Sequence, residues 1–202
     1  RDIVIAFIDG KVYNYHFNSG NLIQTLLTDA GQTTGVSFDS TGQEMTVNFP
    51  ISNKISIYKK SGTIFSQIKT FSLEQPIIYP VTYGDGGILY GVNKENKLVA
   101  INKNTGIMVA GFPASLKKNA ADSPVCADVD GANAGKEVVV PFYFGGGAVY
   151  DSQGTFLSNN LEGKLIYSDH GLAADESRGG IYSNYKDIGG SVFNQNNKTS
   201  VS

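Results

Sequence analysis

Tryptophan is absent from this 202-residue sequence, cysteine occurs once and histidine only twice. A single cysteine, Cys126, excludes an internal disulfide. Its small apolar neighbours indicate a buried side chain rather than a reactive thiol. No apolar run approaches the roughly 20 residues that a membrane-spanning helix needs. The net charge of −2 offers no electrostatic reason to expect nucleic acid or an anionic membrane surface as a partner.

Helical periodicity is also missing, because no window repeats its apolar residues every 3.6 positions. The sequence instead holds 24 glycines, 11 tyrosines and 11 phenylalanines, a mixture typical of many turns and many strands. The first residues are Arg-Asp rather than Met. We therefore expect this chain to be a piece of a longer one.

Three landmarks recur about every 45 residues along the chain, which is the signature of a repeat architecture. The first is an acidic turn after a short apolar run: Asp39, Asp85, Asp128 and Asp175. The second is a predicted two-residue turn between apolar runs: Asp9-Gly10, Asn53-Lys54, Asn96-Lys97, Gly146-Gly147 and Gly189-Gly190. The third is a glycine that closes the next strand: Gly20, Gly62, Gly106 and Gly154.

The segments between these landmarks are short and rich in β-branched and aromatic residues, as strands are. The sequence therefore predicts an all-β fold: a β-propeller or propeller segment, with about four and a half blades of three to four antiparallel strands. The predicted domain covers 1–202, with repeats at approximately 1–32, 33–76, 77–120, 121–168 and 169–202. A β-sandwich or a β-helix explains the recurrence of these landmarks about every 45 residues less well. The first repeat lacks its innermost strand, so the chain is either a five-bladed ring with an incomplete blade or a segment of a larger propeller.

Residues 97–156 resemble the FG-GAP or VCBS-type propeller repeat of bacterial and eukaryotic surface proteins. The matching elements are Asp128-Val129-Asp130-Gly131, the acid Glu137 before a valine strand, the glycine hairpin 145–147, and the exit Gly111-Phe112-Pro113. "KLVAINKNTG" is also similar to the blades of quinoprotein dehydrogenases, but these carry a tryptophan that this chain lacks. The Trp-Asp signature of WD repeats is absent for the same reason.

The resemblance implies a possible calcium site in the loop that follows Asp128. Calcium binds six to eight oxygen atoms, with carboxylates prominent among them. Asp128 and Asp130 hold the first and third loop positions, Asn133 offers an amide oxygen and Glu137 offers the closing carboxylate. Ala132 replaces the acid that the family has at the fifth position. The alternative is that the acids close a turn by accepting backbone hydrogen bonds, which the recurring turn acids of the other repeats favour.

No nucleophile and base are arranged for catalysis, since neither His16 nor His170 lies near a serine or cysteine motif. The sequence therefore predicts no enzyme and no cofactor other than the possible calcium. It predicts a binding or scaffolding propeller of an extracellular or cell-surface protein, with a protein or glycan as ligand. The alternatives are a structural subunit or fragment that completes a larger propeller, with the remaining blades in the same or another chain, and the propeller part of an enzyme whose catalytic residues lie outside this segment.

Overall fold

The fold, taken from a computed structural model, consists of antiparallel β-sheets. The residues that the structure describes are 2–19, 21–29, 31–128, 135–143, 147–158, 172–175, 180–185, 189–194 and 199–201. Within these residues there is no α-helix, and a single 3-10 turn, η1 (Asp85–Gly87), interrupts the strands. Accordingly, no helix of the described part of the chain is long and apolar enough to cross a membrane.

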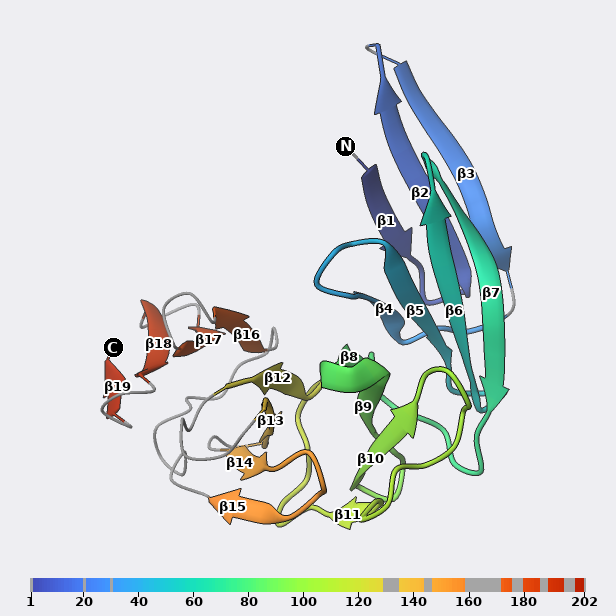
Figure 1. The fold of residues 1–202 in the computed structure, drawn as a ribbon. Helices are drawn as coiled ribbons and strands as arrows, with labels where there is room; N and C mark the ends of the chain where they lie inside the picture. Colours follow the sequence, from blue (N-terminus) through green and yellow to red (C-terminus); the bar gives the residue numbers. More distant parts are fainter. Residues whose placement is uncertain are drawn as a thin grey trace. The chain divides into compact units, whose positions relative to one another are not determined.

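Five sheets follow one another along the chain, and each lies within one of the predicted repeats (Figure 1). Sheet 1 has three strands: β1 (Asp2–Ala6), β2 (Lys11–Asn18) and β3 (Asn21–Asp29). Sheet 2 has four: β4 (Gly35–Phe38), β5 (Glu44–Phe49), β6 (Lys54–Ser61) and β7 (Ile64–Ser72). Sheet 3 consists of β8 (Thr82–Tyr83), β9 (Ile88–Val92), β10 (Lys97–Asn102) and β11 (Ala114–Ser115). Sheet 4 consists of β12 (Val125–Ala127), β13 (Glu137–Pro141), β14 (Gly147–Tyr150) and β15 (Phe156–Ser158). Sheet 5 consists of β16 (Leu172–Asp175), β17 (Gly180–Tyr185), β18 (Gly189–Asn194) and β19 (Thr199–Val201).

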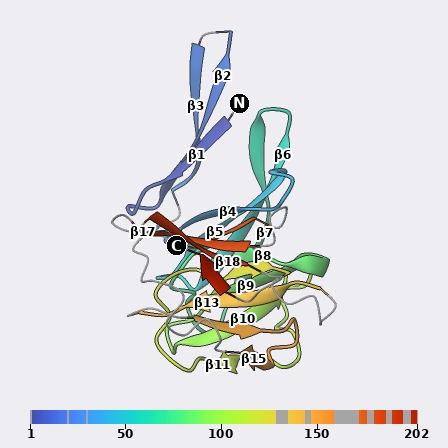
Figure 2. The same cartoon turned by 90° about the vertical axis from the view of Figure 1, so that its left-hand side faces the viewer.

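The chain forms two compact units, Arg1–Tyr83 and Gly84–Ser202. The first contains sheets 1 and 2 and the short strand β8. In both views of the ribbon the β2–β3 and β6–β7 hairpins of this unit point the same way (Figures 1 and 2). Because the strands are antiparallel, the β1–β2 and β5–β6 turns lie at the other end of the two sheets.

The β1–β2, β5–β6 and β9–β10 turns confirm the predicted positions but not the predicted length. The connections 7–10, 50–53 and 93–96 each have four residues instead of two. Each ends on a residue with positive φ: Gly10 at 98°, Asn53 at 53° and Asn96 at 58°. Glycine and asparagine are the residues that tolerate this conformation, which explains why they mark the repeat. In the last repeat the prediction was wrong, because Gly189 and Gly190 lie within β18.

Sheet 1 lacks the strand that would match β4 of sheet 2, as the sequence predicted. Strand β1 pairs with β2 in the way that β5 pairs with β6, and no first strand lies beside β1 in the sheet order of the described residues. Strand β1 is therefore an edge strand of sheet 1 in the described residues.

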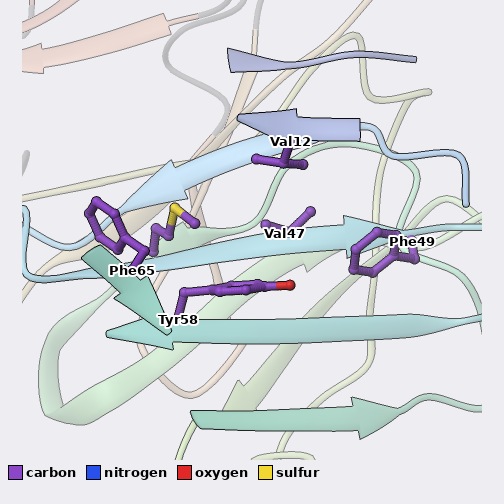
Figure 3. Close-up of a cluster of buried hydrophobic side chains, with 6 residues drawn as sticks. Val12, Val47, Phe49, Tyr58 and Phe65 are labelled. Atoms are coloured by element: carbon purple, nitrogen blue, oxygen red, sulfur yellow. The ribbon is translucent and has the colours of Figure 1, made fainter. Parts of the chain in front are cut away.

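The core of the first unit lies between sheets 1 and 2. Val12 of β2 packs with residues of β5, β6 and β7, namely Met45, Val47, Phe49, Tyr58 and Phe65. Figure 3 shows Val12 and Val47 in the middle of this cluster, between the rings of Phe49 and Phe65. Val4, Ala6 and Leu27 of sheet 1 complete the apolar contact. We call the side of sheet 1 that carries Val4, Ala6 and Val12 its inner face.

Two buried asparagines add polar bonds to this apolar packing. The amide nitrogen of Asn14 in β2 donates to the Thr63 carbonyl in the β6–β7 turn at 2.9 Å. That of Asn48 in β5 donates to the Tyr79 carbonyl at 2.7 Å. Buried amide groups need such partners, because leaving them unpaired costs about 1–3 kcal/mol.

In the second unit the central strands are buried on both faces, as their evenly apolar sequences predict. All residues of β13 and β14 are buried, and β9 and β10 are buried along most of their length. Two predicted landmarks, Gly111 and Gly154, also lie on backbone segments that come close to each other. A Cβ placed on Gly111, which has φ of 91°, would lie 2.0 Å from the carbonyl oxygen of Gln153, the residue before Gly154.

Candidate functional site

The predicted calcium loop is only partly within the described residues. Asp128 follows β12 and is exposed, whereas Glu137 begins β13 and is 1% exposed. The two lie on either side of one hairpin, because Ala127 and Glu137 are partners across the two strands. Asp130 and Asn133 lie outside the described residues. Among the residues that the structure describes, no group of three or more His, Cys, Asp or Glu side chains could hold a metal ion.

Side chains at several turns act as acceptors for backbone amides, in the manner of Asx turns. Asp39 Oδ1 accepts the Glu44 amide at 2.9 Å. Asn93 Oδ1 accepts the amides of the residues two and four positions later, and Asp151 Oδ1 does the same, at 2.7–3.1 Å. At Asp39, one of the four predicted acidic turns, the carboxylate therefore has a structural role as an acceptor of a backbone hydrogen bond. Calcium binding by Asp128, Asp130, Asn133 and Glu137 stays a prediction.

A charged cluster that sequence reasoning missed connects sheets 1 and 2. Asp2 of β1 pairs directly with His16 of β2, with 2.5 Å between Oδ1 and Nδ1, and Lys60 of β6 donates to its other oxygen. The three side chains are only 12–22% exposed. The sequence prediction for His16, a packed or surface residue, agrees with this position. Lys60, the ion-pair partner of Asp2, is 58 positions further along the chain than Asp2, so no local pattern could have revealed the cluster.

The carboxyl of Asp2 titrates below its usual range. The hydrogen bond from Lys60 is the main cause that lowers its pKa, and partial burial acts in the opposite direction. A lowered pKa in the folded state means that the ionised carboxylate stabilises the fold. This contribution is complete above the unfolded pKa near 4 and is lost as the pH falls through the lower folded value.

The Asp2→Asn variant should therefore be less stable than the wild type at pH 7, by about 1–2 kcal/mol, because Lys60 loses its ionic partner. The difference in melting temperature should shrink as the pH falls below 4, where the wild-type carboxylate also becomes neutral. Circular-dichroism melting curves between pH 7 and pH 2.5 measure this. Asp9→Asn is the comparison variant: hydrogen bonds from Lys11 also lower the pKa of Asp9, but this turn carboxylate is exposed, so its loss should change the melting temperature little at any pH. A difference in melting temperature between Asp2→Asn and the wild type that does not change with pH would contradict the role assigned to the ionised Asp2 carboxylate.

Exposed apolar side chains gather at two places in the first unit. The first is the side of sheet 1 opposite its inner face, which we call the outer face. It carries Ile3, Ile5, Phe7, Tyr13, Tyr15, Phe17, Leu22 and Leu26. The second comprises the tips of the β1–β2 and β5–β6 turns, where Ile8 and Ile51 are each 76% exposed. Strand alternation in "DIVIAFI" and "KVYNYHF" could have predicted the outer face, because both alternating sets of these segments are largely apolar or aromatic.

Comparison with known proteins defines the fold but not a family. No family model and no curated protein matches the sequence. Among solved structures, the chain is similar to BamB from Moraxella catarrhalis, a β-propeller protein, with 14% sequence identity and a TM-score of 0.63. The similarity covers 98% of this chain but 56% of the BamB chain. The fold is thus an all-β propeller fold, as predicted, and this chain spans little more than half the length of that propeller protein.

Proposed function

We propose that this chain is a non-catalytic binding or scaffolding propeller of a surface or secreted protein, and that its ligand is another protein. The observation that carries this proposal is the pair Ile8 and Ile51, the two most exposed large apolar side chains of the described residues. Large apolar side chains that are exposed contribute favourable free energy when a partner covers them. The resemblance of residues 97–156 to repeats of surface proteins supports the same location.

The geometry of the two turns suits recognition by a rigid surface. Both turns lie at the same end of sheets that pack on each other, and each is closed by a backbone hydrogen bond, from the Gly10 amide to the Phe7 carbonyl at 2.9 Å and from the Asn53 amide to the Pro50 carbonyl at 3.3 Å. The Lys11 amide donates to Asp9 Oδ1 at 3.1 Å in the first, and Asn53 adopts positive φ in the second. A rigid loop loses little conformational entropy when it binds. Two aliphatic side chains favour an apolar protein surface over a glycan, which is bound through polar groups and aromatic rings.

The double variant Ile8→Ser/Ile51→Ser should lose its protein partner without losing stability, because both side chains are already in water. Immobilised wild-type and variant proteins would be incubated with an extract of the source organism. Captured proteins are then quantified by mass spectrometry and their affinities measured with the purified partner. We expect a loss of affinity of about tenfold or more, the usual effect of removing apolar anchors, with an unchanged melting temperature.

Ile64→Ser is the matched control, because Ile64 is 56% exposed but begins β7 beside the β6–β7 turn, at the opposite end of sheet 2. It should retain the partner. Equal capture by the wild type and the double variant would contradict the proposed surface. Specific binding on a glycan array that the double variant retains would contradict the choice of a protein ligand.

A further inference from the structure

The outer face of sheet 1 corresponds position by position to a face of sheet 2 that is buried. The strand registers define the equivalence, because Ile3 pairs with Tyr15 in sheet 1 as Met45 pairs with Tyr58 in sheet 2. The same rule continues along the strands. The equivalent pairs are Ile3 and Met45, Ile5 and Val47, Phe7 and Phe49, Tyr15 and Tyr58, Gln24 and Gln67, and Leu22 and Phe65.

Most of these equivalent positions are apolar or aromatic in both sheets but differ in exposure, whereas Tyr13 and Leu26 correspond to Ser56 and Thr70. Met45, Val47 and Phe49 are 0–3% exposed, whereas their equivalents Ile3, Ile5 and Phe7 are 41–51% exposed. The eight apolar and aromatic residues of the outer face carry no charge, and Lys11, opposite Phe7, lies at one end of this face. At the position equivalent to Lys60, which binds the carboxylate of the neighbouring sheet, the outer face has Phe17. A predominantly apolar sheet face of this size is suited to burial.

The covered face of sheet 2 shows what kind of surface fits. It is covered by the inner face of sheet 1, whose contacting residues are the small aliphatics Val4, Ala6 and Val12, with Leu27. In this established contact, large side chains of one blade fill the space above small side chains of the next. The outer face of sheet 1, with its isoleucines, leucines and aromatic rings, offers the large half of the same contact.

We propose that the outer face of sheet 1 is a blade-docking surface, which takes a further antiparallel sheet of the same repeat through a face of small aliphatic residues. The similarity to BamB fits this occupant, because the BamB chain continues well beyond the part that matches these residues. A second copy of the chain fits less well. The inner face of its own sheet 1 is already buried against its sheet 2, so only two large-residue faces could meet.

A duplication of the first repeat tests the proposal within the complete chain. Residues 1–43 would be placed ahead of Asp2, because Glu44 is the register equivalent of Asp2. This junction reproduces the natural connection from sheet 1 through β4 to the next sheet. It supplies β1 with the first strand that sheet 1 lacks and offers a copied inner face to the outer face. Lys11→Arg in the copy separates its tryptic peptides from the original ones by mass.

Hydroxyl-radical footprinting then reports the exposure of Ile3, Ile5 and Leu22 in the original sheet 1. We expect their oxidation to fall to the level of the buried Val47, and the melting temperature to rise. A copy with Val4→Asp and Val12→Asp, which places charges on the contacting face, should give no protection. Unchanged oxidation of the original residues in the duplicated chain would overturn the proposal.

Two measurements on the 202-residue chain keep the proposal testable if the duplicated chain folds poorly. Ile5→Ser/Leu26→Ser should lower the melting temperature less than Met45→Ala does, because nearly half of each of these side chains is already in water. A fall equal to or larger than that of Met45→Ala would show that the face is already packed and would overturn the proposal. Sedimentation analysis tests whether a second copy of the chain covers the outer face. A dimer that this double variant abolishes, with the outer face protected in the wild type, would assign the face to self-association and overturn the proposal.

Discussion

Replacing Met45 by Ala is expected to lower the free energy of unfolding by about 2–4 kcal/mol. Met45 is fully buried between sheets 1 and 2, and the variant leaves a cavity in a rigid apolar cluster. The register-equivalent change in sheet 1, Ile3→Ala, is expected to cost less than about 1 kcal/mol, because half of that side chain is already in water. Urea denaturation followed by circular dichroism measures both.

The two variants form a matched pair, since each removes a side chain of similar size from the same position of a repeat. Only the presence of a neighbouring sheet differs between them. Equal losses of stability would mean that the outer face of sheet 1 is covered in solution, and would contradict the exposure described above.

Gly111→Ala is expected to destabilise the second unit by about 3 kcal/mol or more, and to reduce the yield of soluble protein. Two effects add. Alanine tolerates φ of 91° poorly, and its Cβ would lie 2.0 Å from the Gln153 carbonyl oxygen, which belongs to the backbone and cannot move aside as a side chain would. Thermal melting of the purified variant, together with its soluble yield, measures the effect.

Gly86→Ala separates the two causes. Gly86 also has positive φ, 64°, but a Cβ there would meet no atom within 4 Å. It should therefore show only the cost of the backbone conformation, about 1 kcal/mol. If both variants lost the same small amount of stability, the close approach of the backbone near Gly111 would be wrong.

The fold was predictable from the sequence because its turns depend on local chemistry. Gly10, Asn53 and Asn96 occupy a backbone conformation that few residues tolerate, so they mark the repeat even where the strands have diverged. The number of residues in these turns was not predictable in the same way, because a residue such as Lys54 can either end a turn or begin a strand. The structure shows that it begins one.

The binding surfaces were less predictable because they depend on neighbours that are distant in sequence. Ile3 and Met45 look alike as apolar residues in short strands, and only the packing of sheets shows that one is exposed. The contact of Asp2 with Lys60 joins residues 58 positions apart. For the calcium loop, the resemblance supplied a hypothesis about four residues, and the structure describes two of them.

The buried asparagines of the first unit have a consequence for how neighbouring sheets are staggered. Apolar faces attract each other without strong directional preference, so two such sheets could slide along one another at small cost. The bond from Asn14 to the Thr63 carbonyl joins the middle of one sheet to a hairpin of the next. A slide of one residue would separate the two groups and leave both without a partner inside the protein. The hydrogen bond of Asn14 therefore fixes one stagger of the two sheets, where hydrophobic packing alone would allow several.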